Sequence, residues 1–111
     1  SSLFGPPLPA LNANELSDKL KNGQRPLVID VRQPEEYRAG HIAGSKLIPL
    51  GELGKRVNEL PKDREIVCVC ASGNRSHSAT KFLHCALDSI VCLQNQMHNP
   101  QLHHDVILKK E

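Results

Sequence analysis

The sequence predicts a single domain of the α/β class with a central, mostly parallel sheet. Three short apolar runs, rich in β-branched residues, lie at 26–31, 64–70 and 89–93, which is typical of strands covered on both faces. Stretches with apolar residues at helical spacing separate these runs, and this alternation favours parallel strands joined by helices. A chain of 111 residues is long enough to form one core without disulfides or metal.

The first helix is expected to begin after Asn12 and to end at Gly23. Asn is a common helix cap, and Glu15 stands three residues later, as in a capping box. The apolar residues at helical spacing in this segment are Leu11, Leu16 and Leu20. The strand at 26–31 follows this helix.

Two further helices are expected between the strands at 26–31 and 64–70. Pro34 at a first helical position and Gly40 at the end delimit the shorter one. A brief extended segment at 45–50 precedes the other helix, at 51–60, which Pro61 ends. Its expected apolar face consists of Leu53, Val57 and Leu60.

The last long helix is expected over 75–87, directly after the strand at 64–70. Four apolar residues share one face of it and are expected to pack in the core: Ala79, Phe82, Leu83 and Ala86. After the strand at 89–93, the segment 98–111 is compatible with a short helix and a last extended piece.

Composition argues against several kinds of partner. The net charge is +2, and acidic and basic residues are interleaved rather than gathered in a basic face. No run approaches the roughly 18 to 20 apolar residues of a membrane span, and residues 1–10 lack a signal-peptide pattern. We therefore expect a soluble, cytoplasmic protein that binds neither nucleic acid nor membrane, with a tail at 1–10 and a domain at 11–111.

Disulfides and metal sites are not expected. The cysteines lack the density of a disulfide scaffold, which favours reduced thiols at Cys68, Cys70, Cys85 and Cys92. No Cys-x-x-Cys or His-x-x-x-His pair is present, and a metal site built from the histidines at positions 98, 103 and 104 with Cys85 and Cys92 would need ligands from a helix, a strand and a tail. We expect no metal and no cofactor.

The stretch CASGNRS, residues 70–76, combines a thiol, a tight loop and an arginine. Cys70 ends the strand at 64–70, and ligands of open α/β sheets bind at the carboxyl ends of strands. Loop amides with a helix N-terminus beneath them bind anions and favour thiolate over thiol. Gly73 allows the loop to turn tightly, and Arg75 adds a permanent positive charge. The pattern predicts a nucleophilic Cys70 inside an anion-binding loop.

Such a thiolate can attack phosphorus or a sulfane sulfur. Four residues separate Cys70 from Arg75, which is one residue fewer than in the loop of cysteine-dependent phosphatases. A phosphate with its peripheral oxygens needs the wider ring, so the tighter loop favours transfer of a single sulfur atom. An enzyme acting on arsenate or phosphate esters is the less favoured alternative.

Two motifs resemble the single-domain rhodanese-like sulfurtransferases. Residues 27–53, LVIDVRQPEEYRAGHIAGSKLIPLGEL, are similar to the family's Asp-x-Arg, Glu-Tyr and Gly-His-Ile-x-Gly signature, and CASGNRS is similar to its active-site loop. The resemblance covers residues 11–93. It implies a three-layer fold with a five-stranded, mostly parallel sheet flanked by helices.

The same resemblance implies sulfur transfer from thiosulfate or a similar anion to a thiol, cyanide or a protein acceptor, without a cofactor. Cys70 would be the catalytic residue and carry the sulfur as a persulfide. The substrate-binding residues would be Ala71, Ser72, Gly73, Asn74, Arg75 and Ser76. The loop amides would hold the persulfide, and Arg75 would attract the anionic donor.

The segment 94–111 matches the family poorly. The stretch LQNQM has Asn95 and Gln96 where the family has two glycines, and Gln adopts left-handed conformations poorly. The family's Trp is absent, and Pro100 stands in its place. This departure keeps open a second interpretation, a non-catalytic rhodanese-like module that binds a partner or senses oxidants.

Other polar residues near the loop have structural interpretations. Asp30 and Arg32 point to the same side of a strand and are expected to form an ion pair. Glu35 and Glu36 are expected to stabilise the start of their helix through its dipole.

Two histidines and a second cysteine are likewise expected to lie outside the chemistry. We expect His41 to bond to the backbone in a turn and His77 to be solvated. Cys68 lies two residues before Cys70 and is expected in the core, with a role as resolving thiol as the alternative.

Overall fold

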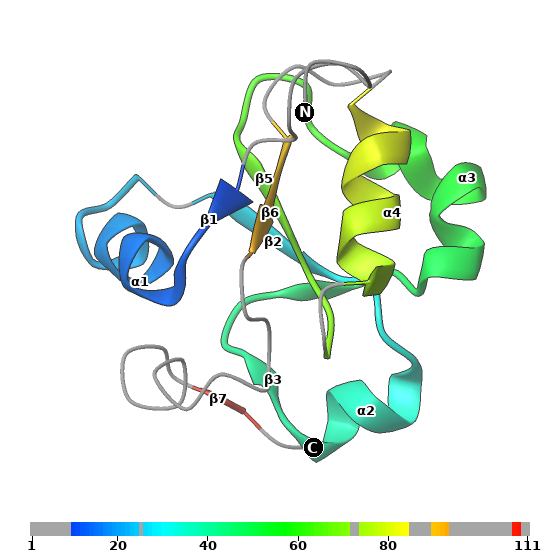
Figure 1. The fold of residues 1–111 in the computed structure, drawn as a ribbon, viewed down its shortest axis with the longest axis horizontal. Coiled ribbons are helices and arrows are strands. Elements are labelled where there is room, and N and C mark those ends of the chain that lie inside the picture. The colour runs from blue at the N-terminus through cyan, green and yellow to red at the C-terminus, as the bar shows by residue number, and fades with distance from the viewer. Residues whose placement is uncertain (1–9, 25, 72–73, 85–89, 94–107, 110–111) are drawn as a thin grey trace.

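Five parallel strands form the central sheet, in the order β1-β6-β5-β2-β4 (Figure 1). They are β1 (Ala10–Leu11), β2 (Leu27–Asp30), β4 (Lys46–Leu47), β5 (Ile66–Val69) and β6 (Ile90–Leu93). A separate antiparallel pair consists of β3 (His41–Ile42) and β7 (Leu108–Lys109). The structure is a computed structural model that describes residues 10–24, 26–71, 74–84, 90–93 and 108–109. The predicted α/β fold with a parallel five-stranded sheet is confirmed.

Helices cover both faces of this sheet. They are α1 (Ala13–Lys21), α2 (Pro34–Ala39), α3 (Leu53–Arg56) and α4 (Asn74–Leu83), with short 3-10 helices η2 (Leu50–Glu52) and η3 (Val57–Glu59) on either side of α3. In Figure 1, α1 lies on one side of the sheet and α3 and α4 on the other. The helix α2 lies beyond the end of the sheet at which β2 finishes (Figure 1). The fold therefore has three layers, as expected.

The core is divided by the sheet into two clusters. Alternate residues of β5 point to opposite faces: Ile66 and Cys68 join the cluster with α3 and α4, whereas Val67 and Val69 join the one with α1. The first cluster also contains Ile29, Val31, Ile48, Leu53, Leu60, Cys70, Ala79, Leu83 and Ile90. The second contains Leu11, Leu16, Val28 and Ile42. Both faces of the central strands are buried, which explains their continuous apolar runs.

The predicted cap of the first helix is present, but the start of the segment differs. The Asn12 side chain accepts a hydrogen bond from the Glu15 backbone N–H at 2.8 Å, and Glu15 accepts one from the Asn12 N–H at 3.0 Å. Leu11 precedes this cap, and it is a buried residue of β1 instead of a helical one. Two-residue strands such as β1 are too short to show a period in the sequence.

The prediction of a single helix at 51–60 is wrong, because the chain forms η2, α3 and η3 there. Its predicted face is nevertheless buried at Leu53 and Leu60 and partly buried at Val57. The inward orientation of these side chains survives the irregular backbone, because packing against the sheet, more than helix propensity, decides it.

The expectation for Phe82 is also wrong, because its side chain is 51% exposed. The buried face of α4 instead consists of Ser76, Ala79, Thr80 and Leu83, at helical spacing. The Thr80 hydroxyl donates to the Ser76 backbone carbonyl oxygen at 2.8 Å, and the Ser76 hydroxyl accepts from the Cys70 thiol, so both buried hydroxyls have a partner. Ala86, the segment 94–107 and the Asn95–Gln96 turn lie outside the described residues.

Candidate active site

Cys70 lies directly after β5, at the carboxyl end of the central part of the sheet. Its side chain is fully buried among the residues that pack between the sheet and α4. The Ser76 backbone N–H donates a hydrogen bond to the Cys70 Sγ at 3.2 Å. The Cys70 thiol in turn donates to the Ser76 Oγ at 3.5 Å. The sulfur therefore sits against the first turn of α4.

This arrangement directs a hydrogen-bond donor of a helix N-terminus at the sulfur. The N–H groups in the first turn of a helix lack partners within the helix, and the helix dipole adds positive potential at that end. The Ser76 N–H belongs to this first turn and is directed at the Sγ. A thiolate or a persulfide anion at Cys70 can accept the same hydrogen bond.

Of the predicted site residues, the structure places Ser76 in contact with Cys70, and Arg75 is the residue before Ser76. Ala71 follows Cys70 and is partly buried, and Asn74 is the first residue of α4. Ser72 and Gly73 lie outside the described residues, so the ring of loop amides stays a prediction.

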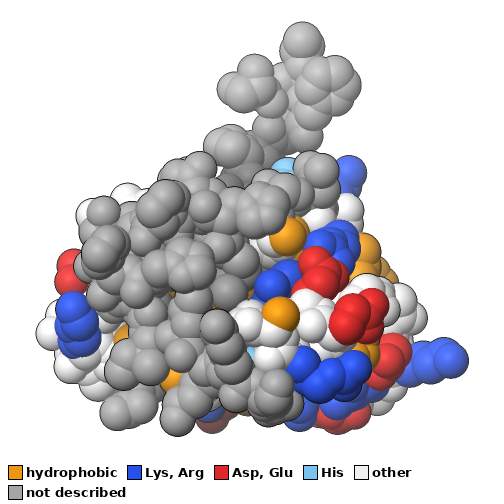
Figure 2. All heavy atoms as spheres, turned by 90° about the horizontal axis from the view of Figure 1, so that it is seen from below, with side chains coloured by type: hydrophobic (Ala, Val, Ile, Leu, Met, Phe, Trp, Pro, Cys, Tyr) orange, Lys and Arg blue, Asp and Glu red, His pale blue; other side chains and the backbone are white. Residues whose placement is uncertain are grey.

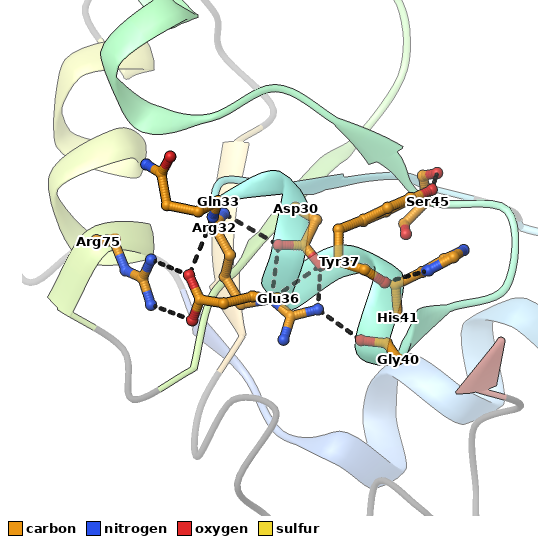
Figure 3. Close-up of polar contacts among 9 residues, drawn as sticks. All are labelled: Asp30, Arg32, Gln33, Glu36, Tyr37, Gly40, His41, Ser45 and Arg75. Carbon is orange, nitrogen blue, oxygen red and sulfur yellow. Dashed lines mark hydrogen bonds and ion pairs between the residues drawn. The ribbon is translucent and has the colours of Figure 1, made fainter. Parts of the chain in front are cut away.

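Arg75 forms an ion pair that the sequence analysis missed. Its Nη1 and Nη2 groups donate to the two carboxylate oxygens of Glu36 at 2.6 and 2.9 Å (Figure 3). Glu36 lies on α2 and Arg75 on α4, so the pair joins the two helices that follow β2 and β5. Glu36 Oε1 also accepts the Gln33 backbone N–H at 3.0 Å. The expected role of Glu36 in starting its helix is therefore only part of its function.

The pair shifts the titration of both partners. The hydrogen bond from Arg75 lowers the pKa of Glu36 to about 2, with the Gln33 N–H contributing in the same direction and burial opposing it. The bond to Glu36 likewise raises the pKa of Arg75. Both groups are therefore charged at neutral pH.

A second, buried ion pair lies at the end of β2. The Arg32 Nε donates to both carboxylate oxygens of Asp30 at 2.9 and 3.1 Å, and its Nη2 donates to Oδ2 at 2.8 Å. The Arg32 Nη2 also donates to the Gly40 carbonyl oxygen at 2.7 Å (Figure 3). The predicted structural ion pair is confirmed, and it ties the end of β2 to the end of α2, which carries Glu36.

The residues expected to be structural behave as such. The His41 ring lies at 2.8 Å from the Tyr37 carbonyl oxygen through Nδ1, and it stacks on the Tyr37 ring with centroids 3.6 Å apart. The Tyr37 hydroxyl donates to the Ser45 carbonyl oxygen at 2.8 Å, so these side chains fix the turn that follows α2. His77 is exposed, and Cys68 is buried in the core. The predicted bond of His41 to the backbone is confirmed, but His41 lies in β3 instead of a turn. The predicted locations of His77 and Cys68 are confirmed.

Cys68 and Cys70 are both buried, and no disulfide joins the two. Within the described ranges, no group of three or more His, Cys, Asp or Glu side chains is placed to hold a metal ion. None of the helices in the same part of the chain is long and apolar enough to span a bilayer. Cys85 and the three histidines at 98, 103 and 104 lie outside the described residues. The cytoplasmic location and the domain limits stay predictions.

Comparison with known proteins gives one consistent family. Residues 12–102 match the rhodanese-like domain. A sulfurtransferase from Allochromatium vinosum is 34% identical over 73 residues, which are 66% of this chain and 68% of that protein. The protein YrkF of Bacillus subtilis is 39% identical over 76 residues, but this match spans only 41% of YrkF.

Solved structures agree with the sequence comparison. A rhodanese-related protein from Thermoplasma volcanium superposes with a TM-score of 0.80 at 31% identity, and the match covers 93% of this chain and 99% of that one. The matched segment of the family extends from the first helix to beyond β6 and includes Cys70 and its loop. The chain therefore belongs to the family of rhodanese-like domains.

Proposed function

We propose that this chain is a sulfurtransferase that carries a sulfane sulfur as a persulfide on Cys70. The single observation that carries the proposal is the Ser76 N–H donating to the Cys70 Sγ at 3.2 Å, at the carboxyl end of β5. This contact supplies the anion stabilisation that a nucleophilic thiolate and its persulfide both need. Sequence relatives that are named sulfurtransferases support the same reaction class.

The reaction has two steps. In the first, the Cys70 thiolate attacks the outer sulfur of thiosulfate, the sulfur–sulfur bond of the donor breaks, and sulfite leaves with the bonding electrons. In the second, cyanide or a thiolate attacks the terminal sulfur of the persulfide. The sulfur–sulfur bond to Cys70 then breaks, thiocyanate or a new persulfide leaves, and the Cys70 thiolate is regenerated.

The residues of the loop would have different roles in the two steps. Amides of the segment 71–76 would hold the terminal sulfur, as the Ser76 N–H already holds the Sγ. Arg75 would attract the anionic donor, and neither step needs a metal or an organic cofactor. A small thiol, cyanide or a thiol of another protein would serve as acceptor.

The experiment is sulfur transfer from thiosulfate to cyanide by the purified protein, together with Cys70→Ser and, as a control, Cys68→Ala. Cys68 lies on β5, two residues before Cys70, and its removal should leave transfer dependent on Cys70 intact. Intact mass after thiosulfate alone should show an adduct of about 32 Da, one sulfur atom, in the wild type and in Cys68→Ala. Cys70→Ser should show neither the adduct nor turnover.

A different result would support the second interpretation, a non-catalytic module. The complete burial of the Cys70 side chain is the observation that favours it, because a buried thiol resists attack. A folded wild-type protein without turnover and without the mass adduct would contradict the sulfurtransferase proposal. An adduct that persists in Cys70→Ser would contradict the assignment of the carrier.

A further inference from the structure

The guanidinium of Arg75, the residue before Ser76 in the predicted loop, already has an anionic partner. Arg75 directs both of its Nη groups at the Glu36 carboxylate, at 2.6 and 2.9 Å, which is the two-pronged geometry of a strong pair. The side chains are 33% and 32% exposed, so both remain accessible from solvent. An anionic sulfur donor that approaches Arg75 therefore has to share it with Glu36.

Chain position and electrostatics connect the pair with the thiol. Arg75 is the residue before Ser76, whose N–H contacts the Cys70 Sγ. Negative charge on Glu36 and, to a smaller extent, on Cys70 raises the pKa of Arg75. The charges of Glu36, Arg75 and Cys70 thus interact with one another. The charge of Glu36 therefore also acts on an ion bound next to Cys70.

The neighbouring charges cancel one another. Asp30 and Glu36 contribute two negative charges, and Arg32 and Arg75 contribute two positive ones, all four in the two ion pairs (Figure 3). On the face shown in Figure 2, acidic and basic side chains of the described residues are intermixed, without a large region of one sign. A dianion approaching this end of the sheet gains little net attraction from these four groups.

We infer that Glu36 is a specificity-determining residue: by compensating the charge of Arg75, it weakens the capture of dianionic donors and favours sulfane-sulfur donors of lower charge. This inference rests on the proposed function. Glu36 contacts neither the sulfur nor the acceptor. It acts through Arg75 and through its own charge.

Two donors of the same chemistry but different charge make the inference testable. Thiosulfate is a dianion, whereas an alkanethiosulfonate, in which an alkyl group replaces one sulfite oxygen, is a monoanion. Attack by the Cys70 thiolate releases sulfite from the first donor and a sulfinate from the second, and both leave the same persulfide. Since Coulomb energy is proportional to the donor's charge, removing the Glu36 charge should affect the dianion about twice as strongly on a logarithmic scale.

The experiment measures kcat/KM with both donors at low ionic strength for the wild type, Glu36→Gln and Glu35→Gln. Glu36→Gln removes the charge but keeps the length of the side chain and one acceptor for Arg75. We expect kcat/KM for thiosulfate to rise about three- to tenfold, mostly through KM, and for the thiosulfonate by about the square root of that factor. The control Glu35→Gln removes a charge from the exposed neighbouring position on α2 and should change either value less than about twofold.

A second variant separates charge from geometry. Glu36→Asp keeps the carboxylate but shortens its reach to Arg75, so the ratio of the two donors should stay near that of the wild type. A change of the ratio in Glu36→Asp as large as in Glu36→Gln would overturn the inference. An equal fall for both donors in Glu36→Gln would do the same, because it would mean that Glu36 only orders Arg75.

The outcomes also distinguish this inference from the proposed function. A wild type that forms no Cys70 persulfide with either donor overturns both. A wild type that turns over both donors, with a donor ratio that Glu36→Gln leaves unchanged, overturns only the role of Glu36. Added salt should reduce the difference between wild type and Glu36→Gln, since the effect is electrostatic.

Discussion

Replacing Asp30 by Asn tests whether the buried ion pair holds the end of β2. The substitution keeps the shape of the side chain and removes its charge. The Asp30 side chain is fully buried and that of Arg32 is 8% exposed, so the remaining arginine cannot recover its hydration without moving. Arg32 would keep the Gly40 carbonyl oxygen as a neutral partner and lose its counterion.

The magnitude follows from this geometry. Asp30 accepts the Arg32 backbone N–H and the side-chain N–H groups of the same residue, so one substitution weakens several charge-assisted bonds at once. Removing one partner of a buried pair costs about 3–5 kcal/mol, which is a large part of the roughly 5–15 kcal/mol that stabilises a domain of this size. We therefore expect Asp30→Asn to lower the free energy of unfolding by about 3–5 kcal/mol.

Urea unfolding followed by far-UV circular dichroism measures this change, because the chain has one Tyr and no Trp for fluorescence. The midpoint should fall by more than about 1 M. The double variant Asp30→Leu/Arg32→Met should lose less stability than Asp30→Asn, since it leaves no buried charge without a partner. A loss below about 1 kcal/mol in Asp30→Asn, or a double variant less stable than the single one, would refute the reasoning.

Two further predictions concern stability. The pKa of Glu36 is lowered from 4.5 to about 2 in the folded protein, so the pair with Arg75 stabilises the fold above about pH 5, and this stabilisation is lost as the pH falls towards 2. Glu36→Gln should therefore be about 1–2 kcal/mol less stable than the wild type at pH 7, after discounting for solvent exposure. Urea titrations should show this difference shrinking between pH 5 and pH 2. A difference that stays constant over this range would contradict the prediction. Leu83→Ala, in the core, should lower the free energy of unfolding by about 2–5 kcal/mol, whereas Phe82→Ala, at a half-exposed position, should lower it by less than about 1.5 kcal/mol. Thermal or urea unfolding measures both, and equal losses would mean that α4 packs through a different face.

The central strands and the place of Cys70 could be predicted because local patterns determine them. Continuous apolar runs identified β2, β5 and β6, and the rule that ligands bind at the carboxyl ends of parallel strands placed Cys70 beside the start of α4. The capping residues of α1 could be recognised for the same reason, since Asn12 and Glu15 act on each other over three residues.

What the sequence did not reveal depends on which strands are neighbours. Glu36 and Arg75 are 39 residues apart and meet because β2 and β5 are adjacent in the sheet. An acidic residue in the helix after β2 indicates a partner for Arg75 only when the adjacency of β2 and β5 is already known. Phe82 was misplaced because Ser76 and Thr80 occupy the buried face of α4. Hydrogen bonds to the Ser76 carbonyl oxygen and from the Cys70 thiol give the two buried hydroxyls partners there.

The order of the strands also has a consequence for the protein as it is being made. The strand that leads to Cys70 is paired on one side with β2 and on the other with β6, whose residues are synthesised only after α4. Until Ile90–Leu93 have left the ribosome, β5 is an edge strand with unpaired backbone groups, and β1 has no neighbour to join. The nascent chain thus passes through a stage in which Cys70 follows an open, aggregation-prone edge strand. When β6 pairs with β5 it covers that edge, and its other edge then becomes available to β1.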